Sequence, residues 1–199
     1  SRWYLIILAL VSSFGIVTKV TFVPLLIIPL LVLPTLRNKI VFLFLTGLSV
    51  ILWTWPIISQ YERIYHWFYA ILSHTGHYGS GNVGIIDPGL YFQNLQNLFF
   101  GNPLFFLIWF FAAGLILIFN GSPARRKRAW QDTSFKVLVA VVVAQLFAVL
   151  MVAKHSSDHY LLPALSLSGL VLFLSFIFLQ RLNYFSLFVT KKVVFVIGI

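Results

Sequence analysis

The sequence contains no cysteine and only four acidic residues, and charged residues of both signs make up just 9% of it. The absence of cysteine excludes a disulfide scaffold. A soluble domain carries about a quarter charged residues, so this chain cannot cover a water-exposed surface. Apolar residues make up 60% of the chain and the mean hydropathy is +0.97, which also excludes disorder and a coiled coil. We therefore expect an integral membrane protein.

Charged and turn-forming residues divide the apolar sequence into seven runs. These are residues 3–17, 20–35, 40–59, 103–120, 137–153, 161–180 and 193–199. A membrane-spanning helix needs about 20 mainly apolar residues, so the last run is too short to span and the first two are marginal. Pro24, Pro29 and Pro34 predict a kink in the second run. The expected fold is all-α: a polytopic transmembrane helical bundle of about six to seven spans, in a single domain over residues 1–199.

The positive charges predict the orientation of this bundle. If Arg2 is cytoplasmic and the spans alternate, most of the cations fall on the cytoplasmic side. Those cations are Arg2, Arg37, Lys39, Arg125, Arg126, Lys127, Arg128, Lys136, Arg181, Lys191 and Lys192. Residues 121–136 then form a basic cytoplasmic loop, which we interpret as an anchor that could contact anionic lipid headgroups rather than as a nucleic-acid site.

The same orientation gathers the other ionisable groups on the non-cytoplasmic side. All five histidines and three of the four acids fall there, the exception being Asp132. The group consists of Glu62, His66, His74, His77, Asp87, His155, Asp158 and His159. We therefore expect a polar site that faces the periplasm, the cell exterior or a lumen.

Residues 60–102 form the predicted non-cytoplasmic loop. Its first part, Gln60 to Leu72, is rich in aromatic residues and suits a short helix lying at the membrane interface. The glycine-rich part from His74 to Gly84 must turn tightly and approach either a ligand or another loop.

The spacing of His74 with His77, and of His155 with His159, is compatible with pairs of metal ligands. No cysteine or pair of carboxylates completes an obvious ligand set, and hydrogen-bonding histidines at the interface are the alternative. We expect no metal or other cofactor, while a divalent metal is left open.

Lys19 and Lys154 lie on the side where the positive-inside rule disfavours cations. Each could be an anchor whose ammonium group extends to the interface. Alternatively, an anionic ligand such as a lipid phosphate would explain both positions.

Two segments carry a resemblance to a known family. Gly15–Leu26 (GIVTKVTFVPLL) and Lys154–Leu165 (KHSSDHYLLPAL) resemble segments of the polyprenyl-phosphate-sugar-dependent glycosyltransferases of the GT-C fold. That group includes the protein O-mannosyltransferases and the lipid A aminoarabinose transferases. The two segments cover about 24 residues near opposite ends of the chain, in the family's order and on its active-site side.

The resemblance implies a transferase that moves a sugar from a lipid-linked donor to an acceptor of unknown class at the non-cytoplasmic face. Donor phosphate or sugar would be bound by Lys19, Lys154, His155, His159 and Tyr160. The loop that carries His74, His77, Tyr78 and Asp87 could close over the site, and Asp158 could orient His155 or pair with Lys154. Membrane lipids would be further partners, and no nucleic-acid partner is expected.

The family's catalytic carboxylate lies in an early outer loop, and the turn at Thr18 and Lys19 contains no acid. Because the chain starts at Ser1 and ends within an apolar run, we expect a C-terminal fragment whose catalytic residue is unknown and lies upstream of Ser1. Two alternatives stay open: a transporter or channel with an outer metal or anion site, and a non-catalytic membrane assembly subunit.

Overall fold

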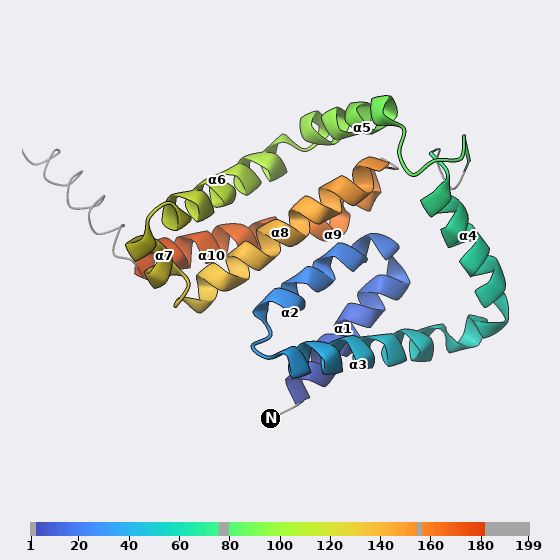
Figure 1. Ribbon diagram of the computed structural model, residues 1–199, viewed down its shortest axis with the longest axis horizontal. Helices are drawn as coiled ribbons and strands as arrows, with labels where there is room; N and C mark the ends of the chain where they lie inside the picture. The colour runs from blue at the N-terminus through green and yellow to red at the C-terminus, as the bar shows by residue number, and fades with distance from the viewer. Residues whose placement is uncertain (1–2, 76–79, 155–156, 182–199) are drawn as a thin grey trace, which may run out of the picture.

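The computed structural model describes residues 3–75, 80–154 and 157–181, and the secondary structure of these residues is helical apart from one isolated bridge between His74 and Val83 (Figure 1). The α-helices are α1 (Trp3–Thr18), α2 (Ile27–Val32), α3 (Leu36–Thr54), α4 (Tyr61–Ser73), α5 (Pro88–Gly101), α6 (Pro103–Asn120), α7 (Pro123–Ala129), α8 (Thr133–Lys154), α9 (Leu162–Leu165) and α10 (Ser168–Arg181). Short 3₁₀ helices are η1 (Val20–Leu26), η2 (Trp55–Gln60) and η4 (Asp158–Tyr160).

Four helical segments of the described chain are long and apolar enough to cross a membrane. They are Leu36–Ser73, Pro103–Asn120, Thr133–Lys154 and Leu162–Arg181. The first two predicted runs form the shorter apolar helices Trp3–Thr18 and Val20–Val32, and residues 193–199 lie outside the described residues. The expected all-α, membrane-type fold is confirmed, with four segments of spanning length.

Proline residues lie inside two of these apolar segments. Pro24 lies inside η1, which passes into α2 at Ile27 through residues with helical backbone angles, so the kink expected of the second run stays a prediction. Pro56 lies in the first turn of η2, and Ile57 there has non-helical backbone angles. The segment Leu36–Ser73 is therefore bent between α3 and α4, and Figure 1 shows α4 steeply inclined to α3.

Helix α8 lies at the centre of the bundle. In its most apolar window, 56% of the residues are buried, against 11% for the segment that contains α3. It packs against α2, α5, α6, α10 and η1, whereas α1 and α3 pair with each other around Leu5, Ala9 and Phe42. Helix α8 therefore has neighbours from several elements along its length.

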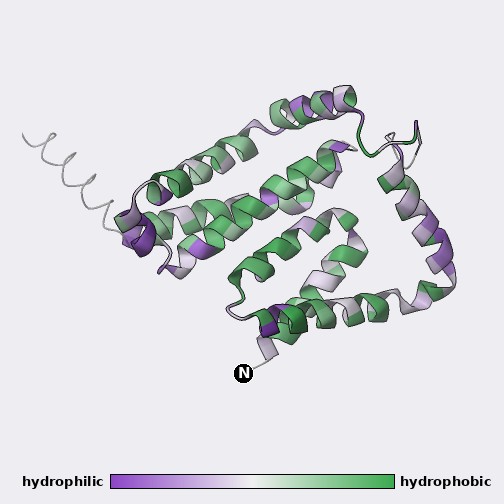
Figure 2. Ribbon diagram, viewed as in Figure 1, coloured by the Kyte–Doolittle hydropathy of each residue, from purple (hydrophilic) through white to green (hydrophobic). Residues whose placement is uncertain are grey.

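Polar residues gather at two ends of the molecule. Figure 2 shows hydrophilic residues concentrated on α7 at one end and on α4 at the other, with a further group at the start of α3 and mainly apolar helical segments elsewhere between them. We call these the α7 end and the α4 end; the latter also contains the start of α5 and the end of α8 (Figure 1). This distribution is expected of helices that run back and forth through an apolar layer.

At the α7 end, Asp132 joins α8 to α10. Its Oδ1 accepts a hydrogen bond of 3.1 Å from the backbone N–H of Phe135, which caps α8, and its Oδ2 lies 3.1 Å from Nη1 of Arg181. Partial burial alone would raise the pKa of Asp132, but the hydrogen bonds from Arg181 and from the start of α8 lower it below its usual value. Asp132 is thus an ionised partner for Arg181 at neutral pH.

Candidate functional site

Lys19 joins two segments that are far apart in the sequence. It lies between α1 and η1 with an extended backbone, and its Nζ donates a hydrogen bond to the backbone oxygen of His159, 140 positions away. The same Nζ lies 5.5 Å from the centroid of the Tyr160 ring, within the range of a cation–π contact. The structure therefore brings Lys19, His159 and Tyr160 together at the α4 end.

A close approach of two elements fixes the turn that carries Lys19. The backbone N–H of Lys19 donates to the oxygen of Gly15 at 2.9 Å, and the N–H of Phe22 donates to the oxygen of Lys19 at 2.9 Å. The ring of Phe22 lies against Gly15 so closely that a Cβ at this position would be 2.7 Å from three ring carbons. Only glycine leaves room for this packing, which sets the position of Lys19.

His159 and Tyr160 are held by η4. Nδ1 of His159 lies 3.0 Å from the hydroxyl oxygen of Ser157, and the rings of His159 and Tyr160 meet edge to face with centroids 4.5 Å apart. The imidazole is exposed and the phenol is half-buried. His155 and the side chain of Asp158 lie outside the described residues, so their expected roles stay predictions.

Lys154, the last residue of α8, contacts α4. Its Nζ donates hydrogen bonds of 2.6 Å to the backbone oxygen of Ile71 and 2.9 Å to that of Leu72. These oxygens belong to the last turn of α4, where helix carbonyls lack intrahelical donors and carry partial negative charge. Lys154 therefore connects two helices, and a phosphate would need its third N–H or would compete with α4.

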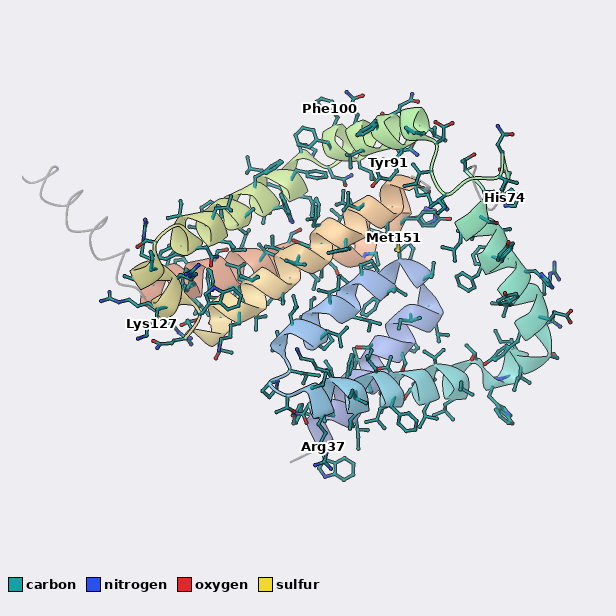
Figure 3. The ribbon with its side chains drawn as sticks, in the orientation of Figure 1. Arg37, His74, Tyr91, Phe100, Lys127 and Met151 are labelled. Atoms are coloured by element: carbon teal, nitrogen blue, oxygen red, sulfur yellow. The ribbon has the colours of Figure 1, made fainter. Side chains whose placement is uncertain are left out.

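Two residues of α5 complete the surroundings of this helix end. The hydroxyl of Tyr91 donates to the backbone oxygen of Leu150 at 3.0 Å, and Nδ2 of the buried Asn94 donates to that of Ala153 at 3.0 Å. Burial raises the pKa of Tyr91 above its ordinary value, so the phenol is a protonated donor at neutral pH. Figure 3 labels Tyr91 on α5 and His74 at the end of α4. The sequence indicated Tyr91 to Leu98 as a second candidate for an interfacial helix but did not include Tyr91 or Asn94 among the site residues, although their i,i+3 spacing places both on one helical face.

The loop after α4 is closed by local contacts. The backbone N–H of Gly84 donates to the oxygen of Ser73 at 2.8 Å, and that of Thr75 donates to the oxygen of Asn82 at 3.0 Å. Gly81 has a φ of 82°, a conformation that favours glycine. This is the tight turn expected between His74 and Gly84.

The candidate loop residues are placed as follows. Nδ1 of His74 lies 3.0 Å from Oγ of Ser73, and Asp87 caps α5 by accepting a 3.2 Å hydrogen bond from the N–H of Leu90. His77 and Tyr78 lie outside the described residues. Closure of this loop over the site stays a prediction.

A metal site was left open by the sequence. Within residues 3–75, 80–154 and 157–181, no group of three histidine or acidic side chains is arranged to hold an ion. Nε2 of His66 lies 4.0 Å from Oε1 of Glu62, and both of these side chains are exposed. The described part of the site offers an ammonium group, an imidazole and a phenol, which are chemically suited to an oxyanion.

Replacing Lys154 with methionine is expected to release α4. None of the residues of α4 is buried, so its contact with Lys154 contributes much of its attachment to the bundle. Loss of two charge-assisted hydrogen bonds should speed amide exchange across α4 by roughly tenfold or more, as measured by hydrogen–deuterium exchange. Lys136→Met, an exposed change at the α7 end, is the control, and unchanged exchange in Lys154→Met would contradict this role.

Comparison with protein-family models, with curated proteins and with solved structures gives no match for this chain.

Proposed function

We propose that this chain is part of an integral-membrane glycosyltransferase that moves a sugar from a polyprenyl-phosphate donor to an acceptor at the non-cytoplasmic face. The observation that carries the proposal is the contact of Lys19 with His159 and Tyr160. These residues come from the two segments that resemble the GT-C glycosyltransferases, and the fold brings the segments together across 140 positions.

The chemistry of the Lys19 cluster suits the departing phosphate. Displacement at the anomeric carbon leaves negative charge on the phosphate, and a fixed ammonium group stabilises that charge. An ammonium has three N–H donors, of which the contact with His159 uses one. The imidazole of His159, held by Ser157, supplies a second hydrogen-bonding group for phosphate or sugar oxygens.

The polar groups of the bundle favour a site at one face over a path through it. The buried polar side chains of the described residues are Ser12, Ser13, Thr21, Thr46, Asn94, Ser134, Gln145 and Ser175. They are neutral, whereas Lys19, Lys154 and His159 lie at the α4 end. A transporter would need ionisable groups along its route more than an enzyme whose reaction occurs at one membrane face.

Binding of the carrier lipid tests this proposal. The purified chain in detergent would be titrated with a polyprenyl phosphate and with the corresponding polyprenol, and binding would be measured by native mass spectrometry. We expect the phosphate to bind more tightly and Lys19→Met to weaken its binding by roughly tenfold or more, since a charge-assisted hydrogen bond contributes about 1.5–3 kcal/mol. The polyprenol should bind both proteins equally.

Two variants control for indirect effects. Lys19→Arg keeps the charge and should retain most of the affinity, and Lys39→Met removes a cation of the other predicted side. Equal binding of phosphate and polyprenol, or unchanged phosphate binding in Lys19→Met, would refute the phosphate site. A loss of the same size in Lys39→Met would show a general charge effect.

A further inference from the structure

Helix α7 concentrates positive charge in a short exposed segment. Four consecutive cations, Arg125, Arg126, Lys127 and Arg128, occupy its middle and last turn, and all are exposed. Figure 3 labels Lys127 at this end of the molecule, and Figure 2 shows the same helix as strongly hydrophilic. This is the densest run of charge in the sequence.

The helix is fixed to the bundle by the residues that follow the cations. Ala129 is fully buried against Phe119, Phe135 and Phe178. Nε1 of Trp130 donates a 2.9 Å hydrogen bond to Oδ1 of Asn120, and its ring meets that of Phe135 with centroids 5.7 Å apart. The four cations therefore project from an anchored helix and not from a loose loop.

The charge of α7 is not neutralised by the acid that follows it in the sequence. Asp132 is the only acid in residues 121–136, and it pairs with Arg181 while capping α8. Among the described residues, the ion pairs are this one and the contact of His66 with Glu62 at the α4 end. The α7 cations thus keep their charge for an external partner.

The position of α7 between two helices of membrane-spanning length indicates where in a membrane an external partner would meet it. The helix connects α6, which ends at Asn120, to α8, which starts at Thr133, and both are long and apolar enough to span a membrane. If α6 and α8 cross a bilayer, the cations lie where two spans leave the apolar layer, near the level of the lipid phosphates. Trp130 is 43% exposed beside them, and amphipathic indole rings prefer the same level.

We propose that α7 and Trp130 form a binding surface for anionic phospholipid headgroups. Arginine guanidinium groups bind phosphate oxygens through paired N–H donors, and a zwitterionic headgroup would compensate the cations less well than an anionic one. This inference does not rest on the proposed glycosyltransferase function, because it concerns the other end of the molecule.

Lipid selectivity of the purified chain tests the surface. The chain would be titrated in detergent with phosphatidylglycerol or phosphatidylcholine, and bound lipid would be counted by native mass spectrometry. We expect a preference for phosphatidylglycerol that falls at least tenfold when residues 125–128 are all changed to Gln, since each basic residue near a membrane surface adds roughly fivefold to binding. Arg63→Gln, at the α4 end, should leave the preference unchanged.

A second measurement does not depend on the quadruple variant. Brominated phosphatidylglycerol in vesicles should quench the fluorescence of the wild-type chain more than brominated phosphatidylcholine does, and Trp130→Phe should remove that difference. Equal retention of the two lipids by the wild-type chain, equal quenching by them, or tighter binding of an RNA oligonucleotide than of phosphatidylglycerol vesicles would overturn the proposal.

Discussion

Replacing Phe178 with alanine is expected to lower the free energy of unfolding by about 2–4 kcal/mol. Phe178 is fully buried near the end of α10, and its ring centroid lies 4.8 Å from those of both Phe119 and Phe135. Truncation would leave a cavity among α6, α8 and α10. The loss should be slightly smaller than the about 3–5 kcal/mol typical of soluble cores, because lipid also solvates the separated helices.

Phe173 provides a matched control on the same helix. Its side chain is 59% exposed, so Phe173→Ala removes the same atoms from a position with few packing partners. We expect a change within about 0.5 kcal/mol. Unfolding by increasing SDS in mixed micelles would measure both variants, and equal losses would contradict the role of Phe178 as a buried packing residue.

The second large effect is expected from Gly15→Ala, which should lower the free energy of unfolding by about 1–3 kcal/mol. The added Cβ would meet the ring of Phe22 at 2.7 Å, well inside the about 3.5–4.0 Å at which carbon atoms attract each other. The added Cβ would clash with the face of the Phe22 ring and not with the end of a flexible side chain. To relieve this clash, η1 must shift away from α1. Lys19 lies between these elements, so its contact with His159 should weaken as well.

Gly47→Ala tests whether the effect comes from the contact. Gly47 also lies within a helix, α3, but a Cβ there would meet nothing within 4 Å. Alanine is the better helix former by up to about 1 kcal/mol, so Gly47→Ala should be neutral or stabilising. In the same unfolding assay, Gly15→Ala should therefore lower the stability and Gly47→Ala should not. A smaller loss from Gly15→Ala in a Phe22→Ala background than in the wild-type chain would assign the clash to this ring.

The helical membrane-type fold could be predicted because it follows from local properties. Apolar runs and the charges between them indicate where the long helical segments begin and end, and Pro56 lies in the first turn of η2, where the segment Leu36–Ser73 bends. The aromatic segment after Gln60 also forms the expected short helix, α4. Each of these features depends on residues within a few turns of one another.

The contacts of the site depend on tertiary packing and could be predicted only in part. Alternation of the spans places Lys19 and His159 on the same side, but it does not reveal that one bonds the backbone of the other. The contact of Lys154 with the end of α4 joins residues 82 and 83 positions apart. Backbone carbonyls have no sequence signature, so a lysine that binds them cannot be distinguished by sequence from one that binds a phosphate.

The hydrogen bond from Asn94 to Ala153 affects the depth at which α8 can end. A carbonyl in the last turn of a helix normally needs water, which keeps helix ends out of hydrocarbon. Here the buried amide of Asn94 replaces that water. This carbonyl at the end of α8 can therefore be buried without a water partner, which lets the helix end closer to the apolar layer. A charge beside such a buried helix end, including the ammonium of Lys154, would be less screened by water, which would strengthen its attraction for an anion.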